Sequence, residues 1–120
     1  MATLLTKLPS ALQNVIKPVN KLTSAGNQSA TINTTSDKLF LLSEVEILGS
    51  IKYSKSGEGS QYAYYKAGNS NRKSVNDSPW AWWERSPRGD NNDFCQVSSQ
   101  GSAEWNRATS PWGVAFGFCV

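Results

Sequence analysis

The stretch that decides the fold is Trp-Ala-Trp-Trp-Glu-Arg-Ser-Pro at residues 80–87. Aromatic residues favour extended chain, and Pro87 cannot donate to a sheet, so residues 80–86 are predicted to form a strand that ends there. Phe94–Val97 is predicted as the next strand, and residues 98–101 as a turn, because Gly101 tolerates the positive φ that such turns need. Residues 102–108 would return as a third strand. The sequence therefore predicts an antiparallel sheet in the last third of the chain.

The final segment, residues 113–120, alternates large and small side chains, and none of them is charged. Such a pattern is typical of a strand that is buried on both faces, so a fourth, central strand is predicted here. The small face leaves room for a bulky neighbour, for which Trp83 is a candidate. The large side chains share the other face: Val114, Phe116, Phe118 and Val120.

Apolar residues between positions 4 and 22 recur at spacings of three and four, which predicts one N-terminal helix over residues 9–17. Pro9 suits its first turn, and Pro18 should end it. Residues 19–23 are expected to be extended. The polar residues 24–37 are expected to form a connection.

A short apolar run at residues 38–42 predicts a strand buried on both faces. Ser43, followed by acidic residues, predicts a helix N-cap, and Gly49 should end that helix. Residues 50–79 are expected to be mostly loop, with a helix of one or two turns near residues 60–66.

Length and composition exclude several classes of protein. A chain of 120 residues fits a single domain, 1–120, and its 38% apolar and 18% charged residues are unlike those of a disordered chain. No apolar run approaches the roughly 20 residues that span a bilayer, so no membrane insertion is expected. The first residues do not resemble a signal peptide, which predicts synthesis in the cytoplasm.

The chain contains no histidine, which removes the most common general base and the most common zinc ligand. We therefore expect no enzymatic activity, no catalytic residues, no cofactor and no bound metal. The net charge of +3 comes from scattered basic residues rather than from a stripe, so no nucleic-acid partner is expected.

The two cysteines, Cys95 and Cys119, match no Cys-x-x-Cys metal or redox motif. Two interpretations stay open for them. They are two buried reduced thiols, or they form a disulfide that joins two strands.

Four motifs occur in order along the chain: Leu-Phe-Leu-Leu-Ser-Glu-Val-Glu at 39–46, Trp-Trp-Glu-Arg-Ser-Pro at 82–87, Phe-x-x-Val at 94–97 followed by Gly101, and Gly-Val-x-x-Gly-Phe at 113–118. Over roughly residues 8–120 they resemble a domain family of unassigned function found in bacterial and phage proteins. That family is similar to the C-type-lectin fold, in the branch that includes formylglycine-generating enzymes and the variable proteins of diversity-generating retroelements. The resemblance implies an α+β, C-type-lectin-like domain with an N-terminal helix, a C-terminal antiparallel sheet and long loops.

Departures from the family pattern limit what the resemblance implies. The family's Arg-Pro in the last motif is replaced by Ala115 and Phe116, and the family's upstream segment is missing before Leu8. The spacing of the two cysteines differs from that of formylglycine-generating enzymes, so their activity is not implied.

The resemblance implies a non-catalytic recognition module of a phage tail or bacterial surface protein, displayed on a virion or cell surface. Its partner would be a host-surface protein or a glycan, bound by the loops 86–93, 98–101 and 104–112. The alternative is a structural module of a viral fibre or tail, acting as a homo-oligomer such as a trimer or within a larger tail assembly.

Aromatic and small polar residues gather in these loops, and such residues make good contact surfaces. The run 90–93 lacks the alternation of calcium loops, so it is expected to be a solvated turn. The resemblance implies that Arg85 pairs with Glu44 or Glu46 and joins the sheet to the short helix; the alternative is that Arg85 holds an anionic ligand. The candidate ligand-binding residues are Arg88, Asp90, Asn91, Asn92, Asp93, Gln100, Trp105, Asn106, Arg107 and Trp112.

Overall fold

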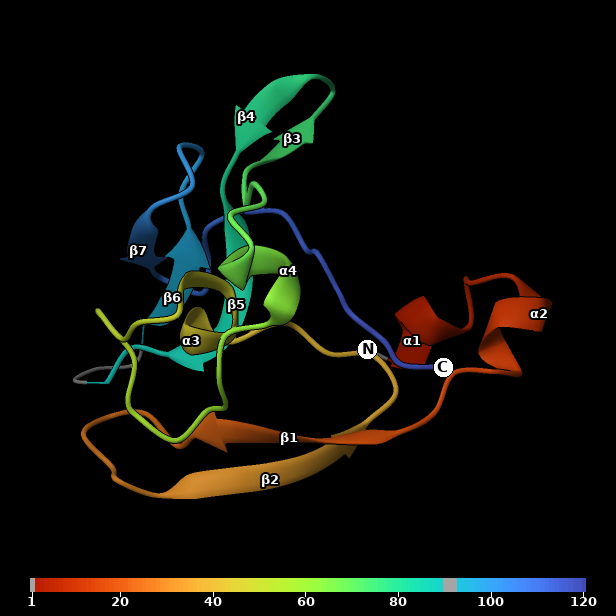
Figure 1. The fold of residues 1–120 in the computed structure, drawn as a ribbon, viewed down its shortest axis with the longest axis horizontal. Coiled ribbons are helices and arrows are strands. Elements are labelled where there is room, and N and C mark those ends of the chain that lie inside the picture. Colours follow the sequence, from red (N-terminus) through yellow and green to blue (C-terminus); the bar gives the residue numbers. More distant parts are fainter. Residues whose placement is uncertain (1, 90–92) are drawn as a thin grey trace.

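The structure is a computed structural model that describes residues 2–89 and 93–120. Within these residues the chain forms small antiparallel sheets joined by long connections and by short helices (Figure 1). The helices are α1 (Ala2–Leu5), α2 (Ser10–Gln13), α3 (Glu44–Leu48) and α4 (Ala63–Lys66).

The strands fall into three separate sheets. Two sheets are hairpins, and the third is a three-stranded meander of strands that are consecutive in sequence. The hairpins pair β1 (Val19–Ser24) with β2 (Ile32–Asp37), and β3 (Lys73–Val75) with β4 (Ser78–Trp80). The meander has the order β5 (Trp82–Pro87), β6 (Phe94–Val97) and β7 (Ala103–Asn106).

The core lies between the meander and α3, where Trp82, Ile47 and Val97 are almost fully buried. Trp82 is the largest of the fully buried side chains, and its indole N–H donates to the carbonyl of Asn71 at 3.0 Å. Leu42 and Leu48 are among the half-buried side chains packed around it. A single buried indole therefore sets the centre of the domain.

Helix α3 begins and ends as its sequence predicts. The Ser43 side chain accepts the Glu46 backbone N–H at 3.2 Å, and the Glu46 carboxylate accepts the Ser43 N–H at 2.9 Å, which is a capping box. Gly49 ends the helix with φ of 74°, a conformation that favours glycine. The helix of one turn near residues 60–66 is also confirmed, as α4.

The predicted N-terminal helix over residues 9–17 is wrong. Only α2, a single turn, forms there, and Val15 beyond it is half exposed. An amphipathic helix needs a surface to cover, and here only Ile16 of that segment is buried. The chain instead turns toward the C-terminal segment, where the Lys17 N–H donates to the Cys119 carbonyl at 2.8 Å.

The predicted fourth strand at residues 113–120 is also wrong. This segment makes only isolated bridges, pairing Gly113 with Trp82, Gly117 with Phe40 and Cys119 with Lys17. Several of its large side chains face solvent, with Val120 exposed to 70%. The apolar alternation is present, but no pair of neighbouring strands encloses the segment.

These differences overturn the expected fold class. The described chain is mainly small antiparallel sheets with few short helices, so it fits an α+β class only loosely. The C-type-lectin-like arrangement of an N-terminal helix beside one C-terminal sheet is not what forms. The continuous strand expected at 80–86 is likewise split at Ala81 between β4 and β5.

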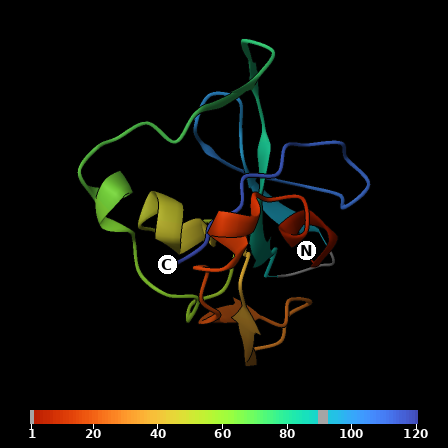
Figure 2. The same cartoon turned by 90° about the vertical axis from the view of Figure 1, so that its right-hand side faces the viewer.

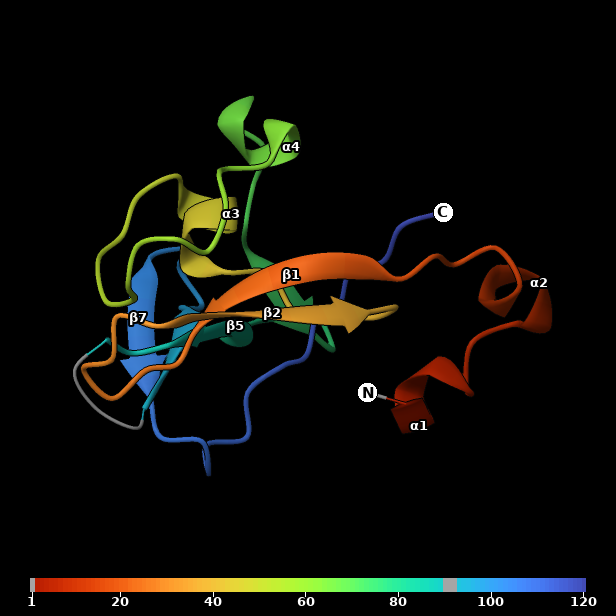
Figure 3. The ribbon, with the colours of Figure 1, turned by 90° about the horizontal axis from the view of Figure 1, so that it is seen from below.

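β1 agrees with the extended chain expected at residues 19–23, whereas β2 and the β3–β4 hairpin occur where a connection and a loop were expected. Residues 73–80 form the β3–β4 hairpin, and Asn76 and Asp77 at its turn have φ of 50° and 66°, a conformation that Asn and Asp tolerate. This hairpin projects from the body of the domain (Figure 2). The β1–β2 hairpin, whose second strand is polar, lies alongside the meander, with β1 near β5 (Figure 3).

Candidate functional site

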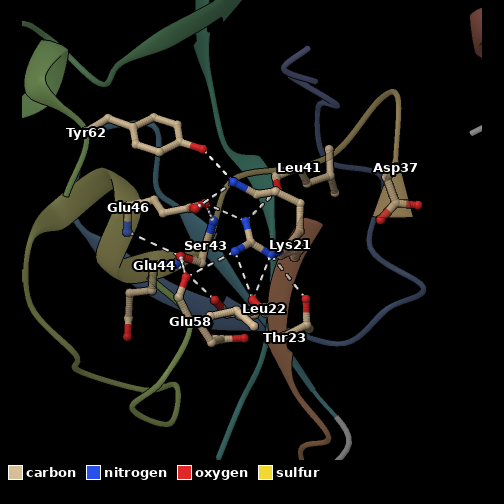
Figure 4. A network of polar contacts seen from close by, with 12 residues as sticks. Lys21, Leu22, Thr23, Asp37, Leu41, Ser43, Glu44, Glu46, Glu58 and Tyr62 are labelled. Carbon is tan, nitrogen blue, oxygen red and sulfur yellow. Dashed lines mark hydrogen bonds and ion pairs between the residues drawn. The ribbon is translucent and has the colours of Figure 1, made fainter. Parts of the chain in front are cut away.

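The interior of the domain is organised around the guanidinium of Arg85 on β5. Its Nε donates to the Thr23 hydroxyl at 3.1 Å and its Nη2 to the Leu22 carbonyl at 2.9 Å, both on β1. Nη1 donates to the Leu41 carbonyl at 3.0 Å, and Nη2 also donates to the Glu58 carbonyl at 3.1 Å. Arg85 therefore joins β1, the segment before α3 and the loop after it (Figure 4).

Arg85 also forms an ion pair with Glu46 of α3, which confirms the predicted link from the sheet to the short helix. The second oxygen of Glu46 accepts from Lys21 at 2.8 Å, and the Lys21 amine also donates to the Tyr62 hydroxyl at 2.6 Å. Burial alone would raise the pKa of Glu46, but hydrogen bonds from Arg85 and Lys21 outweigh burial and lower it. These charges are fully engaged with one another, so their role is to hold the fold.

Three further glutamates lie in the interior, and they differ in how they are satisfied. Glu44 accepts the backbone N–H groups of Lys52 and Ser54 at 2.9 and 3.1 Å. Glu58 accepts the Ser24 N–H through one oxygen only. Glu84 is 2% exposed, and within the described residues neither of its oxygens has a hydrogen-bond partner. Burial, followed by the charges of Glu44 and Glu58, raises the pKa of Glu84 to about 9.

The raised pKa of Glu84 predicts a pH dependence of stability. In protein kept free of bound metal by a chelator, the free energy of unfolding should fall as pH rises from about 4.5 to about 9. In this window the folded protein holds a proton on Glu84 that the unfolded chain has lost. Each pH unit then costs at most about 1.4 kcal/mol of unfolding free energy. Glu84→Gln removes this proton uptake, so the variant should gain stability relative to the wild type as pH rises. Urea unfolding at pH 5, 7 and 9, with a chelator present, measures the difference.

The matched control is Asp77→Asn, which also removes one carboxylate but on the exposed β3–β4 turn. Its stability difference from the wild type should not change with pH over the same window. An equal pH dependence in wild type and Glu84→Gln would contradict the assignment of the proton to Glu84.

A surface pocket of about 360 Å³ opens between the end of β4 and the hairpin of β6 and β7. Trp80 and Trp112 meet there edge to face, with ring centroids 5.8 Å apart. Glu104 and Asn106 of β7 also line the pocket, together with Ser98 and Ser99 from the turn after β6. The pocket thus combines two indole rings with acceptors and donors from three polar residue types.

The structure divides the predicted ligand-binding residues between two faces of the meander. Because successive side chains of a strand point to opposite faces, Trp105 and Asn106 cannot serve one surface. Trp105 lies under Arg88, whose guanidinium carbon is 3.9 Å from the ring centroid, and Arg88 also lies 3.9 Å from Asp93. Asn106 and Trp112 line the pocket on the other face.

The remaining predicted contacts are spread along the loops. Gln100 is exposed in the β6–β7 turn, where its carbonyl accepts from Arg72 at 3.0 Å, and Arg107 is exposed after β7. Neither lines the pocket. Asp90, Asn91 and Asn92 lie outside the described residues. Trp80 and Glu104 also line the pocket, although neither is among the candidate ligand-binding residues; Glu104 lies in the predicted loop 104–112, and the strand register brings it beside Trp80.

The cysteines are both free. Cys95 is buried on β6, whereas Cys119 is exposed, so the disulfide is excluded and only one of the two thiols is buried as predicted. In the described part of the chain no helix is long and apolar enough to cross a membrane.

The fold and site together define a small β-rich domain with an ion-paired interior and an aromatic pocket on its surface. The chain belongs to the family described as Domain of unknown function (DUF6273), whose model matches residues 2–120. Comparisons with curated proteins and with solved structures found no match.

Proposed function

We propose that this domain is a non-catalytic recognition module that binds a saccharide in the pocket between Trp80, Trp112, Glu104 and Asn106. The observation that carries the proposal is the meeting of two partly exposed indole rings with a carboxylate and an amide in one surface pocket of about 360 Å³. Pockets of this size, in which a few polar groups fix the orientation of a ligand on apolar walls, are typical small-molecule sites.

The chemistry of the lining suits a sugar ring. The apolar face of a pyranose packs on an indole, while its hydroxyl groups need both donors and acceptors. Glu104 supplies acceptors, and its carboxylate is held by the side-chain amide of Gln96. The Asn106 carbonyl accepts from the Ser110 hydroxyl at 2.9 Å, which orients its amide nitrogen as a donor. Held side chains lose little entropy when a ligand binds.

Substitutions in the pocket should weaken binding without unfolding the domain. Trp112→Ala or Asn106→Ala is expected to reduce affinity for a bound oligosaccharide by about 1–3 kcal/mol, which is about 5- to 150-fold. A panel of immobilised bacterial and host-surface glycans identifies the ligand, and titration calorimetry with that oligosaccharide measures the loss.

Trp105→Ala is the control, because it removes a partly exposed indole from the opposite face of β7. It should leave glycan affinity unchanged. Absence of binding to every glycan, or equal losses for Trp105→Ala and Trp112→Ala at unchanged melting temperature, would rule out this pocket as a saccharide site. Retention of an isolated host-surface protein in place of glycans would assign the module to a protein receptor.

The proposal includes a setting on a virion or bacterial surface, as a part of a tail or surface protein. The order of the four sequence motifs supports this setting, because they resemble domains of bacterial and phage proteins.

A structural role in fibre or tail assembly is the second candidate function. It is favoured by the apolar C-terminal segment, in which Val114 and Val120 are exposed to 58% and 70%. Sedimentation equilibrium distinguishes the two functions. A trimer would support a role in assembly, whereas a monomer would leave recognition as the remaining candidate.

A further inference from the structure

The interior acids gather next to a thiol. Glu44 at the start of α3, Glu84 on β5 and Cys95 on β6 are all buried, and one ligand atom from each lies within 4.8 Å of the others. These residues are 40 and 11 positions apart in sequence, so the packing of α3 against the meander is what brings them together.

This group lacks a compensating positive charge. The cations of the interior, Arg85 and Lys21, bond to Glu46 instead. Both Glu84 oxygens are without a hydrogen-bond partner at 2% exposure, although a buried polar group left unpaired costs about 1–3 kcal/mol. Glu58, with one unpartnered oxygen, is close enough to act on Glu84 and Cys95 through its charge. A buried carboxyl beside a thiol, with neither oxygen hydrogen-bonded to the described residues, needs an explanation that the ion-paired network does not give.

We propose that Glu44, Glu84 and Cys95 bind a divalent transition-metal ion, of which zinc is the best fit. A divalent cation would supply the missing positive charge and would give Glu84 the partner that the protein does not offer. Because Cys95 and Glu84 come from paired neighbouring strands, and Glu44 from the helix packed on them, the ion would join α3 to the meander.

The mixed ligand set selects the class of metal. Zinc accepts both carboxylate oxygen and thiolate sulfur, whereas calcium and magnesium take oxygen ligands almost exclusively. In a tetrahedral zinc site the ligand atoms stand roughly 3.3–3.7 Å apart, as follows from bond lengths of about 2.0–2.3 Å. With the ligand atoms of the present cluster within 4.8 Å of one another, zinc binding requires these separations to shorten by up to about 1.5 Å, which side-chain rotation can supply.

Glu44 is oriented for this role by groups outside the cluster. Its Oε1 accepts the Ser54 hydroxyl at 2.8 Å and backbone N–H groups from the loop after α3, while Oε2 has only one long contact, from the Tyr53 N–H at 3.3 Å. Hydrogen bonds that hold one oxygen of a ligating carboxylate are typical of metal sites, where they fix the direction of the other oxygen.

The test loads the metal during folding, because the three ligands are enclosed. The full chain is unfolded with a chelator, then refolded with zinc chloride or cobalt chloride and desalted. We expect one metal ion per chain and a higher melting temperature than in the chelated protein. Cobalt should produce the near-ultraviolet charge-transfer absorption of a thiolate ligand.

Variants assign the site. Glu84→Gln and Cys95→Ser should each weaken zinc affinity on the order of 100-fold, and Cys95→Ser should remove the cobalt–thiolate absorption. Cys119→Ser is the matched control and should keep both, because its thiol is exposed and lies outside the cluster.

If Cys95→Ser does not fold, the cobalt spectrum of the wild type and the zinc affinity of Glu84→Gln test the proposal. The absence of stoichiometric metal would overturn the proposal. So would zinc uptake that survives Glu84→Gln, a cobalt–thiolate absorption lost in Cys119→Ser, or displacement of zinc by equimolar magnesium or calcium.

Discussion

Replacing Arg85 with alanine is expected to lower the free energy of unfolding by about 3–5 kcal/mol, the usual cost of removing one partner from a buried ion pair. The Arg85 side chain is 10% exposed and pairs with Glu46, so its loss leaves a buried carboxylate with one fewer cation, held by Lys21 and by the Ser43 N–H. It also leaves carbonyl groups of Leu22, Leu41 and Glu58 without this donor.

Urea unfolding followed by tryptophan fluorescence measures this loss. Arg85→Lys should recover only a small part of it, because one ammonium cannot reach acceptors on several sides as the planar guanidinium does. Arg107→Ala removes an exposed arginine and should change stability by less than about 0.5 kcal/mol. A loss below about 1 kcal/mol for Arg85→Ala would show that the network contributes little to the fold.

Trp82→Ala is expected to cost about 3–5 kcal/mol, because the indole is 1% exposed at the centre of the core. Its neighbours Ile47 and Val97 come from α3 and β6, so the cavity would lie between the helix and the sheet. The carbonyl of Asn71 would also lose the indole N–H.

The measurement is chemical denaturation, with Trp105→Ala as the control. Trp105 is 37% exposed, so its removal should cost much less than that of Trp82. If the two alanine variants were equally stable, Trp82 would not be the residue around which the core packs.

The parts of the fold that could be predicted are those with a local cause. Ser43 and Gly49 determine the ends of α3 through a capping box and a left-handed residue, whatever packs on the helix. Phe94–Val97 and the turn at Gly101 also follow from adjacent residues, and β6 has the predicted bounds.

The parts that failed depend on distant neighbours. The pattern of residues 9–17 is helical, but Ile16 is the one residue of this segment that is buried, so the helix does not extend beyond the single turn of α2. Residues 113–120 alternate large and small side chains as a buried strand does. They are nevertheless not a strand of the meander, which consists of β5, β6 and β7. Conversely, β2 forms from polar residues because β1 pairs with it along its whole length.

The candidate site shows the same division. Sequence composition pointed to Asn106 and Trp112, which line the pocket, but it also pointed to Trp105, which the alternation of β7 turns away. The expectation that the chain binds no metal rested on the lack of histidine and of closely spaced cysteines. The proposed ligands Glu44, Glu84 and Cys95 share no motif, so only the folded chain could bring them to notice.

The contacts of Arg85 have a consequence for how the domain melts. Three sheets with no shared strand would ordinarily be free to open one at a time. Here one side chain of the meander holds carbonyls of the first hairpin and of the loops on both sides of α3, so opening any of these parts exposes the same buried charges. The first hairpin, the loops around α3 and the meander are therefore expected to unfold as one cooperative unit, with a single transition in place of a stepwise loss of structure.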